Sequence, residues 1–148
     1  MTKQDSPDLS QISGLHWAFD YIGRPWVNGG RGPDNFDCWG FFRYIQGEHF
    51  NTVVPVIEID ANNFRAVAQK IMGADERDNW VVTNIPTQGC AVLMAHSKYP
   101  SHVGIWLDVD GGGVLHCIRG EGVVFSTISS LKTCGWGRVE YYKHVSNT

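Results

Sequence analysis

Apolar side chains in the first part of the chain recur with helical spacing. A first helix is expected between Ser13 and Gly23, because Gly23 and the nearby Pro25 are typical of a helix exit. Its apolar stripe follows positions i, i+3, i+4 and i+7 and consists of Leu15, Ala18, Phe19 and Ile22. This stripe predicts a helix that packs one side against a core.

Two further helices are predicted downstream. Asp37 is a good N-cap for a largely apolar, buried helix over 37–46, and Gly47 is its expected end. Asp60 caps the next helix, over 60–72, which a glycine ends. The apolar stripe of that helix consists of Phe64, Val67, Ala68, Ile71 and Met72.

From Trp80 onward, glycine or proline separates short apolar stretches that have the character of strands. The predicted strands span 81–83, 90–94, 102–109, 114–118, 123–126 and 138–142. Helices followed by antiparallel strands predict an α+β fold, in which N-terminal helices pack against a C-terminal antiparallel sheet of about five or six strands. The length suits a single domain, 1–148, with 1–12 as a flexible polar lead-in.

Composition and charge argue against several classes of protein. With 43% apolar, 12% aromatic and 18% charged residues, the chain is not expected to be disordered. A net charge of −3 without a basic cluster disfavours nucleic-acid binding. No apolar run is long enough for a membrane span. Residues 1–15 lack the pattern of a secretory signal peptide, so we expect the chain to stay in the cytoplasm after synthesis or to leave by another route.

Cys38 is the first residue with candidate chemistry. Its expected place is the first turn of the helix that Asp37 caps, after a glycine-rich loop. Unpaired N–H groups and the positive end of the helix dipole favour a thiolate there, so we expect a lowered pKa for Cys38 and a nucleophilic role. The alternative is a buried cysteine that only fills space.

Two histidines lie on neighbouring predicted strands. Pairing His102 directly with His116 centres a hairpin on Val109, within a turn of glycines and aspartates. Their separation is even, so both rings can project from one face, with His116 holding the second nitrogen of a base, His102. Two solvated histidines that meet by chance are the alternative.

The remaining histidines and cysteines point to no second site. A metal centre of Cys38, His102 and His116 lacks a ligand-spacing motif, no CxxC occurs, and Cys117 must face away from His116, so no metal or cofactor is expected. Cys90 and Cys117 are predicted core residues, and Cys134 has no clear role. Four histidines are predicted to be at the surface or structural, namely His16, His49, His96 and His144.

Several stretches, in this order, resemble the NlpC-type cell-wall cysteine peptidases, which are papain-like enzymes. The stretches are Tyr21-Ile22-Gly23-Arg24-Pro25-Trp26-Val27-Asn28-Gly29-Gly30, Phe36-Asp37-Cys38-Trp39-Gly40, Ser101-His102-Val103-Gly104-Ile105 and Leu115-His116. The resemblance covers roughly residues 13–142. The Asp-Cys-Trp-Gly variant and the Pro-Trp pair look most like the branch found on phage and prophage tails.

The resemblance implies a papain-like fold and a function. It implies that Cys38 is the nucleophile, His102 the general base and His116 the residue that orients it. Members of the family cleave amide bonds in peptidoglycan stem peptides, near D-γ-glutamyl and diaminopimelate groups, through an acyl-enzyme and without a cofactor. The implied partners are cell-wall peptidoglycan and phage tail-tip proteins, and the implied location is a tail or virion.

The sequence departs from the family pattern beside the nucleophile. Trp26 stands where the family usually has a tyrosine, and Trp39 where it usually has a serine. We therefore count Trp26, Asp37, Trp39 and Ser101 as candidate substrate or oxyanion residues. Two alternatives remain open: a papain-like deamidase or acyltransferase, and a non-catalytic tail-tip or wall-binding protein.

Overall fold

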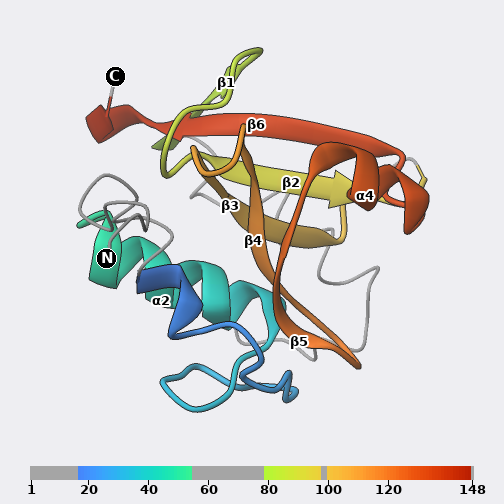
Figure 1. Ribbon diagram of the computed structural model, residues 1–148. Helices are drawn as coiled ribbons and strands as arrows, with labels where there is room; N and C mark the ends of the chain where they lie inside the picture. The colour runs from blue at the N-terminus through green and yellow to red at the C-terminus, as the bar shows by residue number, and fades with distance from the viewer. Residues whose placement is uncertain (1–16, 55–78, 98–99, 148) are drawn as a thin grey trace, which may run out of the picture.

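A computed structural model describes residues 17–54, 79–97 and 100–147. Its centre is a six-stranded antiparallel sheet with the strand order β1-β6-β2-β3-β4-β5 (Figure 1). The strands are β1 (Trp80–Thr83), β2 (Ala91–Ala95), β3 (His102–Leu107), β4 (Gly113–Ile118), β5 (Gly122–Ser126) and β6 (Arg138–His144). Among the described residues, the helices with both ends defined are α2 (Cys38–His49), α4 (Ile128–Thr133) and the 3-10 helix η3 (Val145–Asn147). The predicted α+β class is confirmed.

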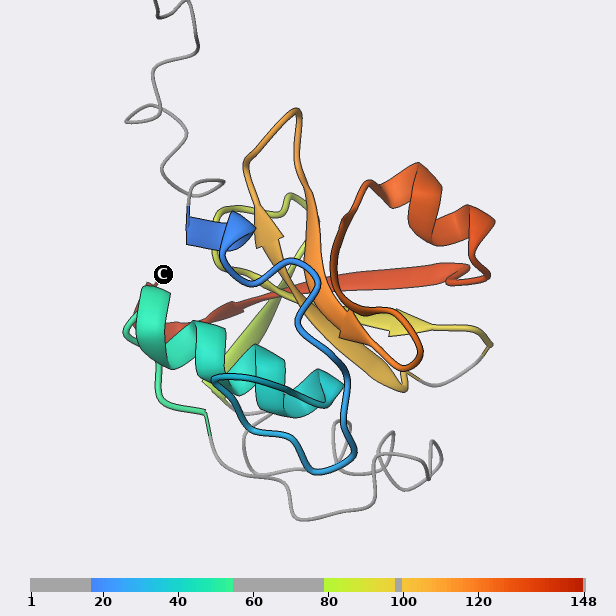
Figure 2. The same cartoon turned by 60° about the horizontal axis from the view of Figure 1, so that its bottom comes forward.

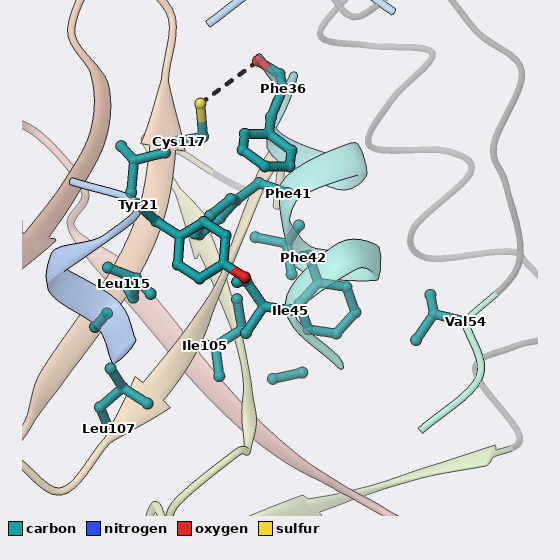
Figure 3. Close-up of a cluster of buried hydrophobic side chains, with 14 of the residues drawn as sticks. Tyr21, Phe36, Phe41, Phe42, Ile45, Val54, Ile105, Leu107, Leu115 and Cys117 are labelled. Carbon is teal, nitrogen blue, oxygen red and sulfur yellow. Dashed lines mark hydrogen bonds between the residues drawn. The ribbon is translucent and has the colours of Figure 1, made fainter. Parts of the chain in front are cut away.

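The two helices α2 and α4 lie on opposite faces of the sheet (Figure 2). Alternate residues of each strand point to opposite faces, so each face builds its own apolar cluster. On the α2 face, Phe36, Phe41 and Ile45 pack against Ile105 and further strand residues (Figure 3). On the α4 face, Leu131 is buried against strand residues that include Val92, Met94, Trp106 and Val114.

Helix α2 begins as predicted and ends later than predicted. The Asp37 side chain accepts a hydrogen bond from the N–H of Gly40, which caps the helix. The helix continues through Gly47 to His49, so the expected end at Gly47 is wrong. Asn51 instead takes the left-handed conformation with φ 53°, and the N–H of Thr52 returns to the Gln46 carbonyl.

The first helical pattern is only partly reproduced. Residues 17–19 are helical and a turn follows over 20–23. Ala18 is buried as expected, but Phe19 and Ile22 are 61% and 41% exposed, and Tyr21 takes their place in the core. The helix ends so early that the 3.6-residue period no longer applies at Tyr21. The segments 1–12 and 60–72 and the residue Leu15, for which the sequence also makes predictions, lie outside the described residues.

All six predicted strands are present, with ends that shift by one or two residues. The third strand ends at Leu107, before the predicted end at Val109. The helix α4 was not expected, because six residues with two apolar positions give too short a pattern. Its capping residue Thr127, which accepts from the N–H of Ser130, is the sequence feature that marks it.

The hairpin between β3 and β4 differs from the predicted register. Ile105 pairs with Leu115 and Leu107 with Gly113, so the hairpin centres on Asp110 and His102 does not stand directly opposite His116. The turn explains the shift, because Asp110, Gly111 and Gly112 all have positive φ. A shift of an even number of residues keeps both histidines on one face.

Candidate active site

Cys38 is the first residue of α2, and the loop before it is held against the helix. The N–H of Asp37 donates to the Gly30 carbonyl, and a Cβ atom at Gly40 would collide with that same carbonyl. Only glycine therefore fits at position 40. The Asp37 carboxylate accepts from the N–H groups of Gly40, at 2.7 Å, and of Gly29, at 3.1 Å. These contacts fix the position of the sulfur at the helix tip.

The sulfur of Cys38 lies in a dry environment. Burial, followed by the Asp37 carboxylate, raises the pKa of Cys38 to about 12, while the N–H groups of Trp39, Val103 and Cys38 itself act in the opposite direction. The expectation of a lowered pKa is therefore wrong, because desolvation outweighs the helix tip. The influence of the Val103 N–H also shows that the sulfur lies near the start of β3, one residue from His102.

His102 and His116 form a buried pair. His102 Nε2 and His116 Nδ1 are 2.8 Å apart, and the side chains are 5% and 0% exposed. Burial, with His116 and His96 nearby, lowers the pKa of His102 well below its usual value. Burial lowers the pKa of His116 to about 4. Both rings are therefore neutral near pH 7, so one of them donates the shared proton and the other accepts it.

The sequence does not predict the place of three residues beside this pair. Ser126 Oγ lies 2.9 Å from His116 Nε2. The Trp136 ring stacks on His102 with centroids 5.0 Å apart, and exposed His96 stacks on Trp136 at 3.7 Å. Ser126 could have been found from its position on the next strand, on the face of His116. Nothing in the sequence links Trp136 or His96 to His102, because that contact depends on the turn after α4.

Each predicted substrate or oxyanion residue lies beside the start of α2 or of β3. Trp26 is half-buried and forms a parallel bridge with Phe36. The half-buried Trp39 packs on Phe42, with ring centroids 5.3 Å apart. Ser101 directly precedes His102 and donates its N–H to the Met94 carbonyl at 3.0 Å. The N–H of Trp39 is one of those that act on the Cys38 sulfur.

The other cysteines occupy the places that the sequence predicts. Cys90 and Cys117 are buried, Cys134 is exposed, and all four thiols are free. Cys117 faces α2, where its Sγ lies 3.5 Å from the Phe36 carbonyl (Figure 3), whereas its neighbour His116 faces Ser126 on the opposite side of the sheet.

Neither a metal site nor a membrane-crossing helix is found among the described residues. Within 17–54, 79–97 and 100–147, no group of three or more histidine, cysteine, aspartate or glutamate side chains could hold a metal ion. In the same part of the chain, no helix is long and apolar enough to cross a membrane.

The fold is the papain-like α+β arrangement, with a cysteine at a helix tip and a histidine pair on the adjoining sheet. Residues 23–142 match the NlpC/P60 family, and the chain belongs to that family. It is 28% identical over 121 residues to a probable endopeptidase p60 of Listeria grayi, a match that covers 82% of this chain and 20% of the relative. The chain thus spans about a fifth of that relative's length.

Solved structures show the same fold. The NlpC/p60 domain of the peptidoglycan hydrolase SagA has a TM-score of 0.55 at 24% identity, and the match covers 86% of this chain and 92% of that one. A lipoprotein-like NLP/P60 family protein of Staphylococcus aureus has a TM-score of 0.52 at 22% identity, covering 95% of this chain and 44% of that one.

Proposed function

We propose that this protein is a cysteine peptidase that hydrolyses amide bonds in peptidoglycan stem peptides, near D-γ-glutamyl-diaminopimelate. The observation that carries the proposal is the buried pair of His102, at the start of β3, and His116. The next residue, Val103, has its N–H near the Cys38 sulfur, where it lowers the pKa of the thiol. Membership of the NlpC/P60 family and the similarity to a probable endopeptidase support this class of reaction.

The proposed reaction begins from a neutral thiol and a neutral imidazole. Cys38 Sγ bonds to the amide carbonyl carbon while His102 takes the thiol proton, because both pKa shifts disfavour a separated ion pair at rest. The C–N bond then breaks, and His102 gives the proton to the leaving amine. Water attacks the thioester with His102 again as the base, which releases the acid and restores the thiol.

The start of α2 supplies a candidate donor for the oxyanion. The first-turn N–H groups of Gly40 and Phe41 already donate to the side chain and the carbonyl of Asp37. The N–H of Cys38 itself lies near the sulfur and lowers the pKa of the thiol. We therefore assign this N–H to donate a hydrogen bond to the developing oxyanion, with the Trp26 indole N–H as a second candidate donor. We assign Trp39 and Ser101 to the walls of the substrate site and Asp37 to holding the helix tip.

Digestion of purified muropeptides followed by mass spectrometry tests the proposal. Wild-type protein should release stem-peptide fragments cut at the D-γ-glutamyl-diaminopimelate bond, and Cys38→Ala should release none. Cys134→Ala is the matched control, because Cys134 is exposed and remote in sequence from both histidines. Wild-type protein that binds peptidoglycan without cleaving it would instead favour the non-catalytic wall-binding alternative.

We further propose that the protein is a phage or prophage tail component, made in the cytoplasm and assembled into the particle. The support is the resemblance of Asp37-Cys38-Trp39-Gly40 and of the Pro25-Trp26 pair to the tail-associated branch. Antibody detection on purified particles should find the protein at the tail tip. Its absence from intact particles that still infect would refute this assignment and leave the peptidase proposal untouched.

A second candidate reaction is amide hydrolysis or acyl transfer on a protein glutamine. The observation that favours it is the dry setting of Cys38, which is 8% exposed, because an amine can then compete with water for the thioester. Ammonia release from glutamine peptides, with intact muropeptides under the same conditions, would favour this reaction over stem-peptide cleavage.

A further inference from the structure

We propose that Ser126 is a positioning residue that holds His116 in the tautomer required for His102 to act as a base. The inference rests on the proposed function for its purpose, but its geometry stands independently. His102, His116 and Ser126 form one chain of hydrogen-bonding groups, with contacts of 2.8 Å and 2.9 Å.

Ser126 is held by the sheet on the same face as both histidines. It is the last residue of β5 and pairs with Val114 of β4, while His116 pairs with Val124. Its side chain is therefore diagonal to His116 on one face, a distance that a histidine ring can span. His116 is fully buried, so solvent does not reach its Nε2. Ser126 is the hydrogen-bond partner of that nitrogen.

The protons along this chain can be counted. For His102 to accept the thiol proton at Nδ1, its Nε2 must carry a proton and donate it to His116 Nδ1. A neutral His116 that accepts at Nδ1 must carry its own proton on Nε2. That proton needs an acceptor, and the Ser126 hydroxyl oxygen is the group within hydrogen-bond distance.

The opposite arrangement would block the base. If Ser126 donated to His116 Nε2, then His116 would carry its proton on Nδ1 and donate it to His102 Nε2. His102 would then carry its own proton on Nδ1, and that nitrogen could not receive the thiol proton. Ser126 is half-buried, so its own hydroxyl hydrogen can turn toward solvent while its oxygen accepts from His116.

The test compares Ser126→Ala, which removes the acceptor, with Ser126→Thr, which keeps a hydroxyl and suits a strand. Ser130→Ala is the matched control, since Ser130 is an exposed serine on the following helix. Two-bond proton–nitrogen spectra of labelled protein report which nitrogen of His116 is protonated. The pH dependence of kcat/KM on muropeptides reports the basicity of His102.

We expect wild-type His116 to carry its proton on Nε2, and Ser126→Ala to lose that preference. In Ser126→Ala, kcat should fall about 3- to 10-fold with KM unchanged, the range expected for one lost neutral hydrogen bond. The acidic limb of kcat/KM should also move to lower pH. Without Ser126, the hydrogen bonds that link His102 to His116 stabilise protonated His102 less, so the pKa of His102 falls. Ser126→Thr and Ser130→Ala should resemble wild type in every measurement.

Two results would overturn the inference: a wild-type His116 protonated on Nδ1, or an unchanged tautomer and acidic limb in Ser126→Ala. Loss of activity through a damaged fold alone would leave the pH limb in place, which also counts against the inference. If wild-type protein cleaves no muropeptide, the proposed function fails, while the spectra still decide the role of Ser126.

Discussion

At the scale of single residues, burial decides the state of the Cys38 thiol. A charge at the end of a helix is typically stabilised by about 0.3–1 kcal/mol, and by up to about 2 kcal/mol in favourable sites. The rise of the Cys38 pKa from 9.0 to about 12 corresponds to roughly 4 kcal/mol in the other direction. The sulfur is therefore a thiol at rest, and in the proposed reaction the imidazole of His102 removes its proton as the sulfur attacks.

This state predicts the order in which the thiols react. Under brief treatment with iodoacetamide at pH 7, exposed Cys134 should be alkylated before Cys38, because only the thiolate reacts and burial suppresses it at Cys38. Peptide mapping by mass spectrometry gives the rate at each site. If Cys38 instead reacts faster than Cys134, even at pH 5 to 6, the resting site is a thiolate–imidazolium pair and the neutral-pair mechanism is wrong.

Asp37 adds to the raised pKa of Cys38, so removing its charge should make the thiol more acidic. Asp37→Asn keeps an oxygen for the N–H of Gly40 but cannot accept equally well from Gly29, and we expect a loss of about 1 kcal/mol in the free energy of unfolding. Alkylation of Cys38 should become faster. Asp37→Ala is the comparison, because it also loses the cap and should be less stable in urea titrations. Equal alkylation rates in Asp37→Asn and wild type would contradict the assigned role of the charge.

At the scale of elements, the turn after α4 packs against the histidine pair on the face of the sheet opposite α2. Trp136 lies in this turn and covers His102. Trp136→Ala should admit water to the ring and raise the pKa of His102 toward its usual value, so the acidic limb of kcat/KM should move to higher pH. Trp136→Phe keeps an aromatic cover and is the control. A limb that stays in place in Trp136→Ala would show that the cover contributes nothing to the low pKa.

The elements also show what a single sequence can and cannot predict. The cap at Asp37 and the alternation within the strands are local signals, so the start of α2 and all six strands were predicted. The end of α2 at His49 depends on Asn51 adopting positive φ, and the hairpin register depends on the turn at Asp110. These backbone conformations are determined by the packing of surrounding residues, and the local sequence pattern carries no information about that packing.

In the candidate site, too, local sequence signals predict some features and not others. Even spacing placed His102 and His116 on one face although the assumed register was wrong, because parity survives a shift by two. The protonation of Cys38 could not be predicted, since its pKa is set by burial from elements distant in the sequence. The contact of Trp136 with His102 likewise joins a turn to a strand that no local rule connects.

At the scale of the whole molecule, the histidine pair should make stability depend on pH. His116 has a pKa of about 4 in the folded protein, against 6.5 in an unfolded chain. Between these values the unfolded state binds more protons, so the free energy of unfolding must fall as the pH falls. From pH 7 to pH 5, His116 alone should remove roughly 2 kcal/mol, and His102, whose pKa is also lowered, should add to this loss.

Urea titrations at pH 7 and pH 5 measure this loss, and His116→Gln isolates the contribution of one ring. The variant should be less stable than wild type at pH 7, because it disturbs the contacts with His102 and Ser126. Its stability should nevertheless fall by roughly 2 kcal/mol less than that of wild type between the two pH values, because glutamine takes up no proton. Carboxyl groups titrate mostly below this window, and their contributions cancel in the difference. Parallel losses in both proteins would mean that His116 can be protonated in the folded state, and the neutral histidine pair would have to be abandoned.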